Sequence, residues 1–190
     1  MITPGRSYKA VVIGVSAGGL RAMEAILPHL PAEYDLAVLI VQHRAKTSDD
    51  FLYNYFDNLC ALNVMEAADK MKIKAGNIYF APPDFHMLVE MDKSLSLSVD
   101  PAVNFSRPSV DVLFETAAES YGEQLVGVVL TGSNSDGAKG LARIKDLGGT
   151  SIIQDPETAE VAMMPQAAIQ EVGGDYIIPL PSIGKLLASL

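Results

Sequence analysis

The sequence has little of what would place it in several large classes of protein. Its 190 residues hold one cysteine, Cys60, and no tryptophan. A single cysteine excludes an internal disulfide and any metal site built from several thiolates, and it suits a reducing cytoplasm. No apolar segment approaches the roughly 20 residues of a membrane-spanning helix. Glycine and serine interrupt the apolar residues near the start, which argues against a signal peptide. We therefore expect a soluble, cytoplasmic protein.

Positive charge is also scarce. The chain has 14 Lys and Arg against 23 Asp and Glu, which gives a net charge of −9. Binding nucleic acid without sequence preference requires a basic surface, so this charge argues against a nucleic-acid partner. Hydrophobic residues make up 49% of the chain, and a chain of this length buries roughly 70% of its unfolded surface. Residues 1–190 are therefore expected to form one domain whose core needs no disulfide or metal.

Five short segments rich in Val, Ile and Leu predict strands that are buried on both faces. They are residues 10–15, 36–42, 125–132, 150–154 and 175–180. Segments with the apolar spacing of a helix lie between them: one follows Gly19, one follows Ser109 as its N-cap, and one spans 136–149. Strands that alternate with helices predict an α/β fold, a doubly wound and mainly parallel sheet with helices on both faces. Period-two patterning over 76–100 predicts an antiparallel hairpin appended to that sheet.

Three of the predicted strands end in the residue types that a serine hydrolase requires. Ser16 follows the first strand, His43 follows the second, and Asp136 lies in the loop after the third. The carboxyl ends of parallel strands lie along one edge of a sheet, so these side chains are expected to meet there. A serine hydroxyl needs an imidazole to take its proton, and the imidazole needs a carboxylate to orient it. The Gly-x-Ser-x-Gly spacing around Ser16 suits a nucleophile on a sharp strand-to-helix turn.

Other interpretations of the same residues are open at this point. Gly14, Ser16 and Gly19 also resemble a dinucleotide-binding loop, although serine replaces its middle glycine and no acidic residue ends the next strand. Asp155 also follows a predicted strand and competes with Asp136 for the carboxylate role. The chain order Ser, His, Asp, with no room for strands before the serine, argues against a lipase-like α/β-hydrolase. We interpret the two remaining histidines as structural residues: His29 and His86.

Six segments spread over essentially the whole chain carry a more specific signal: IGVSAGG, VQH, IYFAPPDFHM, RPSVDVLF, GVVLTGSNSDGAKGL and MMPQAAI. As a set they resemble the catalytic domain of the chemotaxis protein-glutamate methylesterases, the CheB type. The resemblance implies a cytoplasmic enzyme that hydrolyses glutamate γ-methyl esters on chemoreceptor helices or another methylated protein, releasing methanol, and that can deamidate receptor glutamines. It implies that Ser16 is the nucleophile, His43 the general base and Asp136 the acid that orients the base. It implies no cofactor and no metal.

The same resemblance suggests further site residues and shows where the chain departs from the family. The backbone N–H groups of Ala17 and Ser133 are expected to stabilise the oxyanion, and Arg107 to hold an acidic substrate segment. Ala17 stands where the family commonly has a small hydroxyl residue, and Ser133-Asn134 replaces Met-Gly in the loop before the acid. Asn tolerates positive φ better than most residues, so the turn at Asn134 is expected to persist. Residues 44–50 replace a Pro-rich segment.

The sequence does not decide how activity is controlled, and it leaves two alternative functions to consider. Most members of the family carry a receiver domain before the catalytic domain, and this chain is expected to lack one because its first predicted strand begins at residue 10. A degenerate family member would bind a receptor or signalling partner without turnover, which the altered loop at Asn134 would explain. A nucleotide-binding domain would use the glycine loop around Ser16 instead. An acidic enzyme and an acidic receptor segment repel each other, which slows their association.

Overall fold

The computed structural model describes residues 7–44 and 51–190. The strands are β1 (Ala10–Val15), β2 (Ala37–Gln42), β3 (Asn63–Glu66), β4 (Asn77–Phe80), β5 (His86–Val89), β6 (Leu95–Ser98), β7 (Leu125–Val129), β8 (Thr150–Gln154) and β9 (Tyr176–Ile178). The helices are α1 (Gly19–Glu24), α2 (Phe51–Asp57), α3 (Val110–Tyr121), α4 (Ala138–Asp146), α5 (Met163–Val172) and α6 (Leu180–Ala188), with short 3-10 turns η1 (Leu27–His29), η2 (Gly122–Gln124) and η3 (Pro156–Thr158). None of the helices in these two ranges is both long enough and apolar enough to cross a bilayer.

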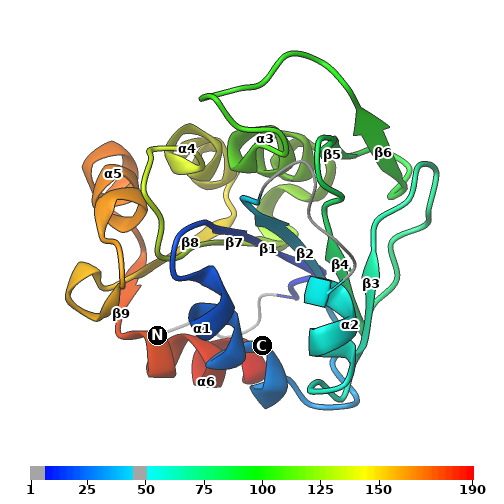
Figure 1. The fold of residues 1–190 in the computed structure, drawn as a ribbon, viewed down its shortest axis with the longest axis horizontal. Helices are drawn as coiled ribbons and strands as arrows, with labels where there is room; N and C mark the ends of the chain where they lie inside the picture. The colour runs from blue at the N-terminus through cyan, green and yellow to red at the C-terminus, as the bar shows by residue number, and fades with distance from the viewer. Residues whose placement is uncertain (1–6, 45–50) are drawn as a thin grey trace.

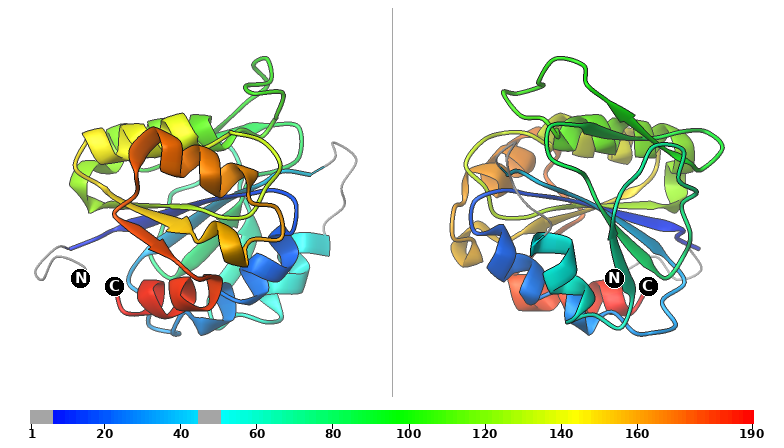
Figure 2. Two further views of the ribbon diagram at one scale, coloured as in Figure 1. Left: turned by 90° about the vertical axis from the view of Figure 1, so that its left-hand side faces the viewer. Right: turned by 45° about the vertical axis from the view of Figure 1, so that its right-hand side comes forward.

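In these ranges, seven parallel strands form one sheet between two layers of helices, and β5 and β6 form a second, antiparallel sheet (Figures 1 and 2). The order along the large sheet is β3-β4-β2-β1-β7-β8-β9. The chain runs outward from β1 to β2 and then to β3 at the edge, and β4 fills the place between β2 and β3. It then crosses to β7 and builds outward on the other side. The order therefore reverses between β1 and β7. Ligands of such sheets bind at this reversal, beyond the carboxyl ends of the strands.

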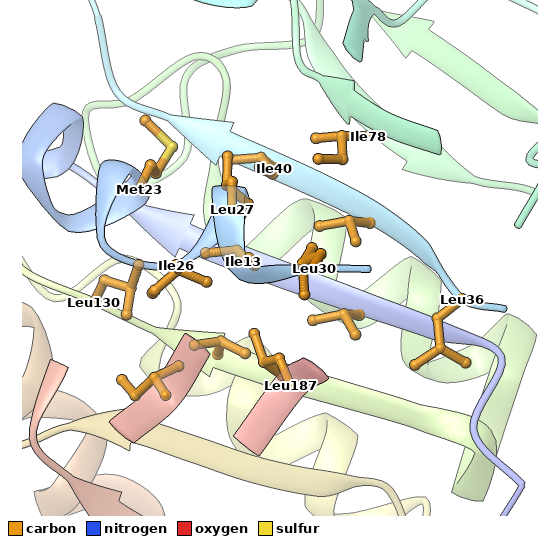
Figure 3. Close-up of a cluster of buried hydrophobic side chains, with 14 of the residues drawn as sticks. Ile13, Met23, Ile26, Leu27, Leu30, Leu36, Ile40, Ile78, Leu130 and Leu187 are labelled. Atoms are coloured by element: carbon orange, nitrogen blue, oxygen red, sulfur yellow. The ribbon is translucent and has the colours of Figure 1, made fainter. Parts of the chain in front are cut away.

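Alternate side chains of β1 enter two hydrophobic clusters on opposite faces of the sheet, as expected for a strand covered on both sides. Val11 and Ile13 belong to the cluster that α1, α2 and α6 cover. Ala10 and Val12 belong to the cluster under α3, α4 and α5. Figure 3 shows the first cluster, in which residues of α1, η1 and α6 lie over the sheet: Met23, Leu27 and Leu187 with Ile13 and Ile40. Loops at the carboxyl edge therefore start from strands that are held on both faces.

The predicted α/β architecture is confirmed, and the five predicted strands form β1, β2, β7, β8 and β9. The antiparallel hairpin is present as β5 and β6, with His86 opposite Ser98. It forms its own sheet against α3 rather than extending the main one. β4, from the same patterned stretch, pairs in parallel with β2. The sequence analysis missed β3, because this edge strand has the sequence NVME, with only Val64 buried and no apolar run.

Backbone hydrogen bonds continue past the ends of β1, β2 and β7 into the loops that follow them. Ser16 N donates to Thr131 O, and His43 N donates to Val15 O, both at 3.0 Å. The residue after β1 is thus tied to the loop after β7, and the end of β1 to the loop after β2. The segment between β6 and α3 projects beyond the helices (Figure 1), and part of it, residues 105–108, lines a cavity together with His43.

Candidate active site

Ser16 lies in the turn that joins β1 to α1. Its carbonyl oxygen accepts hydrogen bonds from Gly19 N and from Gln42 Nε2, both at 3.0 Å. Gly18 has a φ of 78°, in the left-handed region that glycine enters without the steric cost of a Cβ. The helix α1 begins at the next residue. The predicted strand-to-helix turn is therefore present, and it places Ser16 at the carboxyl edge of the sheet.

Gly132 lets the loop after β7 approach this turn closely. A Cβ at this position would lie 2.9 Å from Ser16 Cβ and 2.0 Å from Met164 Sδ. Both distances are shorter than van der Waals contact between such atoms. The close approach of the two loops therefore requires glycine at position 132.

His43 and Asp136 form a direct contact, with His43 Nε2 2.8 Å from Asp136 Oδ2. The Asp136 side chain is fully buried and the His43 side chain is 11% exposed. Asp136 also accepts hydrogen bonds from Ser109 Oγ at 2.8 Å, Val110 N at 2.7 Å and Asp111 N at 3.0 Å. The two backbone groups are the first N–H groups of α3, which have no partner inside the helix and lie at the positive end of its dipole. The start of α3 thus surrounds the carboxylate with donors.

These donors keep Asp136 ionised. Burial acts to raise the pKa of Asp136, but the hydrogen bonds from His43 and from the N–H groups of Asp111 and Val110 outweigh it, so the pKa is lowered. A carboxylate accepts hydrogen bonds and cannot donate them. The neutral imidazole of His43 therefore carries its proton on Nε2, which leaves the lone pair on Nδ1 as its basic site.

The lone pair of His43 Nδ1 faces an amide in this structure. Asn134 Nδ2 lies 3.3 Å from His43 Nδ1. Asn134 does not adopt the predicted positive φ; its Oδ1 instead accepts from Asp136 N at 3.1 Å, which shapes the loop. Ser16 and His43 line one cavity of about 610 Å³, but no hydrogen bond joins Ser16 Oγ to the imidazole within the described residues.

The backbone around Ser16 has free donors for an oxyanion. In the described part of the chain, the N–H groups of Ala17, Gly18 and Ser133 donate to no protein acceptor. Thr131 Oγ1 donates to Ala17 O at 2.8 Å. Because C=O and N–H point in opposite directions across a trans peptide, the Gly18 N–H points away from Thr131. Ala17 and Gly18 line the cavity with Ser16, which suits the donor role predicted for Ala17; the role of Ser133 stays a prediction.

A turn at Asn104 supports the carboxylate of Asp136. Val103 and Ser106 exchange backbone hydrogen bonds of 3.1 and 2.9 Å, with Asn104 between them at a φ of 50°. Asn104 Nδ2 donates to Asp111 Oδ2 at 2.8 Å and to Asp136 Oδ1 at 3.3 Å. The amide thus bridges two buried carboxylates. No sequence motif marked Asn104, because its partners lie beyond the next helix start and in another loop.

His86 is structural, as predicted, but it belongs to the same network. It is buried, with 1% of its surface exposed. Its Nδ1 accepts from Ser109 N at 3.2 Å, and its Nε2 lies 3.2 Å from Pro101 O. His86 therefore fixes the backbone of the serine whose hydroxyl donates to Asp136.

Arg107 lies in a second cavity, of about 360 Å³, which is also lined by His43. Its guanidinium already donates to Asp84 Oδ1 at 2.7 and 2.9 Å and to the carbonyls of Val99 and Asp100. These contacts hold the segment after β6 against the segment after β4. The predicted role of Arg107 in holding substrate stays a prediction.

Arg21 is a cation that the sequence analysis missed. It lines the cavity of Ser16, its side chain is 84% exposed, and it lies 3.9 Å from Glu160. An exposed surface pair at this distance contributes little to stability, so Arg21 remains accessible to a ligand. The one signal in the sequence is its place in the first turn of the helix that follows Ser16.

Asp155 and Asp136, the two carboxylates that follow predicted strands, make different contacts. The side chain of Asp155 accepts from Glu157 N at 3.0 Å and caps η3, whereas the carboxylate in contact with His43 is that of Asp136. Within residues 7–44 and 51–190, no three His, Cys, Asp or Glu side chains converge as they would around a metal ion. Most of the segment that departs from the Pro-rich pattern, residues 45–50, lies outside the described residues.

Comparisons with known proteins concern the sequence and fold of the chain as a whole. Residues 11–187 match the sequence model of the family described as CheB methylesterase. The chain also matches the crystal structure of the Thermotoga maritima CheB methylesterase catalytic domain, with a TM-score of 0.90 and 37% identity. That match covers 96% of this chain and 98% of the other. Fold and sequence thus point to the same group of proteins.

Two relatives show how the chain compares in length. A protein of Leptospira interrogans, provisionally named a protein-glutamate methylesterase/protein-glutamine glutaminase, is 50% identical over 97% of this chain and 95% of its own length. The protein-glutamate methylesterase/protein-glutamine glutaminase of Hydrogenovibrio crunogenus is 37% identical over 97% of this chain and 50% of its own length. This chain therefore spans nearly all of the first relative and about half of the second.

Proposed function

The chain belongs to the CheB methylesterase family and is a protein-glutamate methylesterase, in which we propose that Ser16, His43 and Asp136 carry out the reaction. The observation that supports this assignment is the 2.8 Å contact between His43 Nε2 and the buried carboxylate of Asp136. Ser16 shares the cavity of His43. Residues 1–190 are proposed to act as one catalytic domain.

The proposed reaction follows from the proton positions in the site. Ser16 Oγ attacks the ester carbonyl carbon while its proton moves to His43 Nδ1, the free lone pair. The N–H groups of Ala17 and of the loop at Ser133 donate hydrogen bonds to the developing oxyanion, and each such donor contributes about 3 kcal/mol. His43 returns the proton to the departing methoxide, which leaves as methanol. Water then attacks the acyl-serine with His43 as base and releases the glutamate.

The proposed substrates are methylated glutamates on the cytoplasmic helices of chemoreceptors, or on another methylated protein, which would place the enzyme in the cytoplasm. The names of the relatives also include glutaminase activity. The same acyl-serine chemistry would deamidate a glutamine, because ammonia can replace methanol as the leaving group. Arg21 and Arg107 are the proposed contacts for carboxylates next to the reacting side chain.

A second candidate is a degenerate member that binds a receptor without turnover. The amide on His43 Nδ1, in place of a hydrogen bond from Ser16, favours it. Methanol release from receptor-bearing membranes with labelled methyl esters decides between the two, with wild type compared with Ser16→Ala. Release that vanishes in Ser16→Ala supports the esterase and its nucleophile. Absence of release from folded wild type, with several receptors tried, would instead support the binding function.

A further inference from the structure

We propose that Asn134 is a positioning residue that occupies the basic nitrogen of His43 in the free enzyme, and that it must release this nitrogen before Ser16 can react. The inference rests on the proposed function, because it concerns the same nucleophile and base. Asn134 is one of the two residues at which this loop departs from the motif that the resemblance implies, so the inference concerns chains with a side-chain amide here.

The orientation of the Asn134 amide follows from its two neighbours. Asp136 N is a donor only, and it lies 3.1 Å from Asn134 Oδ1. The oxygen of the amide therefore points toward Asp136, and the NH₂ group points toward His43 Nδ1 at 3.3 Å. The alternative orientation would place two donors against each other and leave Nδ1 facing an oxygen. The hydrogen-bond geometry thus makes Asn134 a donor to the imidazole.

Asn134 and Ser16 compete for a single acceptor. Asp136 holds the proton of neutral His43 on Nε2, so Nδ1 has one in-plane lone pair for hydrogen bonding. That lone pair receives the Asn134 N–H in this structure and must receive the Ser16 proton in the reaction. A donor on the neutral base also stabilises the unprotonated form against the imidazolium that forms as Ser16 attacks.

The released amide has another acceptor close by. Asn134 Nδ2 lies 3.5 Å from Ser106 Oγ, at the limit of hydrogen bonding. Ser106 lines the second cavity beside His43 and closes the turn that holds Asn104. A small shift of the amide toward Ser106 therefore frees Nδ1 without leaving a donor unpaired, which keeps the cost of release low.

The charged groups near His43 make contacts other than one with Nδ1. Asp136 contacts Nε2. In the second cavity, Arg44 pairs with Glu66 and Arg107 pairs with Asp84. In the cavity of Ser16, Arg21 pairs with Glu160. A change at Asn134 thus alters the neutral group on Nδ1 and none of these pairs.

The test uses a small fluorophosphonate, which needs no receptor. Ser16 Oγ forms a bond to phosphorus, the P–F bond breaks, fluoride leaves, and the serine proton passes through His43 Nδ1 to solvent. The rate of labelling is measured by intact mass from about pH 5 to about pH 9, the range over which histidines titrate. Ser16→Ala gives the background, and Ser135→Ala, an exposed neighbour in the same loop, is the matched control.

Two variants distinguish the hydrogen bond that Asn134 donates to His43 from the contact with Asp136 N that shapes the loop. Asn134→Ser keeps an oxygen for the Asp136 N–H, as short polar side chains do in such turns, but is too short to reach the imidazole. It is expected to label on the order of fivefold faster than wild type, the factor for one neutral hydrogen bond. Asn134→Asp replaces the donor with a carboxylate that favours imidazolium, so the acidic limb of its profile is expected to move to higher pH.

The outcomes separate this inference from the proposed function. Wild type that labels at the same rate as Asn134→Ser, or faster, with no shift of the Asn134→Asp profile, overturns the role of Asn134 and leaves the esterase intact. Wild type that neither labels nor releases methanol overturns both. Should Asn134→Ser fail to fold, the pH profile of Asn134→Asp decides alone. A residue that only supported the loop would slow labelling at every pH without moving the profile.

Discussion

Asp136 serves the His43 imidazole and the first turn of α3 at the same time. Ser109 occupies the N-cap position of α3, but its side chain makes no capping bond and donates to Asp136 instead. The Asp136 carboxylate then accepts hydrogen bonds from the N–H groups of Val110 and Asp111 at the start of the helix, in place of a capping side chain. The proposed catalytic acid is therefore also a structural residue, and the two roles can be separated only by measuring activity and stability together.

Asp136→Asn is expected to lower turnover by on the order of 10⁴, because the amide no longer fixes the proton on His43 Nε2 or stabilises the imidazolium. Methanol release and fluorophosphonate labelling measure the effect, with circular dichroism to verify folding. Asp155→Asn, which changes a carboxylate at a neighbouring strand end, is the matched control and should keep wild-type turnover. A loss below about tenfold in folded Asp136→Asn contradicts the assignment.

Ser109→Ala tests whether the hydrogen bond from the Ser109 hydroxyl stabilises the Asp136 carboxylate. The serine hydroxyl is fully buried and donates to an ionised group, and such bonds contribute about 1.5 to 3 kcal/mol to the free energy of unfolding. The pKa of Asp136 is lowered by folding, so its stabilising effect is present above the unfolded pKa and is lost as the pH falls through the folded pKa. Urea unfolding of Ser109→Ala should therefore show a deficit at neutral pH that shrinks in acid. A deficit independent of pH would indicate lost packing instead.

At the scale of elements, the strands and the edge of the sheet at which Ser16, His43 and Asp136 lie could be predicted, and the contacts between loops could not. Strands that are buried on both faces can be recognised in the sequence as apolar runs. The residues that follow three of them lie at one edge of the sheet: Ser16, His43 and Asp136. The contacts of Asn134 and Asn104 depend on how three loops fold against one another. Each links residues on different loops, and no local propensity encodes such a contact. Ser109 is the N-cap residue of α3, as predicted, but its side chain donates to Asp136 in another loop, a contact that no local propensity encodes.

Gly132→Ala tests the approach of the β7 loop to the β1 turn. Its Cβ would meet both Met164 Sδ and Ser16 Cβ, and such overpacking costs about 1 to 3 kcal/mol of unfolding free energy. The single variant should lose stability and fluorophosphonate labelling together. Adding Met164→Ala relieves the contact with sulfur and leaves the contact with Ser16. The double variant, compared with Met164→Ala alone, should therefore show a smaller stability loss while labelling stays slow. Restored labelling would contradict the contact with Ser16.

At the scale of the whole molecule, the sequence predicted the layers better than the accessory sheet. Helices on both faces follow from strands without a polar face, and both clusters are present. The pairing of β5 with β6 as a separate sheet does not follow, because period-two patterning cannot say which strand lies beside which. Residues Met87 and Leu95 of this pair enter the cluster of α3, so helix packing rather than strand pattern sets its position.

The net charge of −9 is also a property of the whole molecule, and it affects encounter with an acidic substrate. Near the site, Arg21, Arg44 and Arg107 each lie within 4 Å of a carboxylate, at 3.9, 3.1 and 2.7 Å. These pairs are close to neutral, so they do not offset the overall charge. Like charges slow association, and salt screens them over a Debye length that falls from about 30 Å at 0.01 M to about 10 Å at 0.1 M.

The value of kcat/KM on a methylated receptor fragment is therefore expected to rise severalfold over that range of salt, while labelling by a small neutral fluorophosphonate stays constant. Glu160→Gln removes the carboxylate beside Arg21 and should raise kcat/KM at low salt, with the gain vanishing as salt increases. Glu123→Gln, exposed beside the amino end of β7, changes the net charge equally and should gain less. A fall of kcat/KM with salt would show that the arginines attract substrate despite their partners. Equal gains in both variants would show that net charge alone governs encounter and that Arg21 has no part in it.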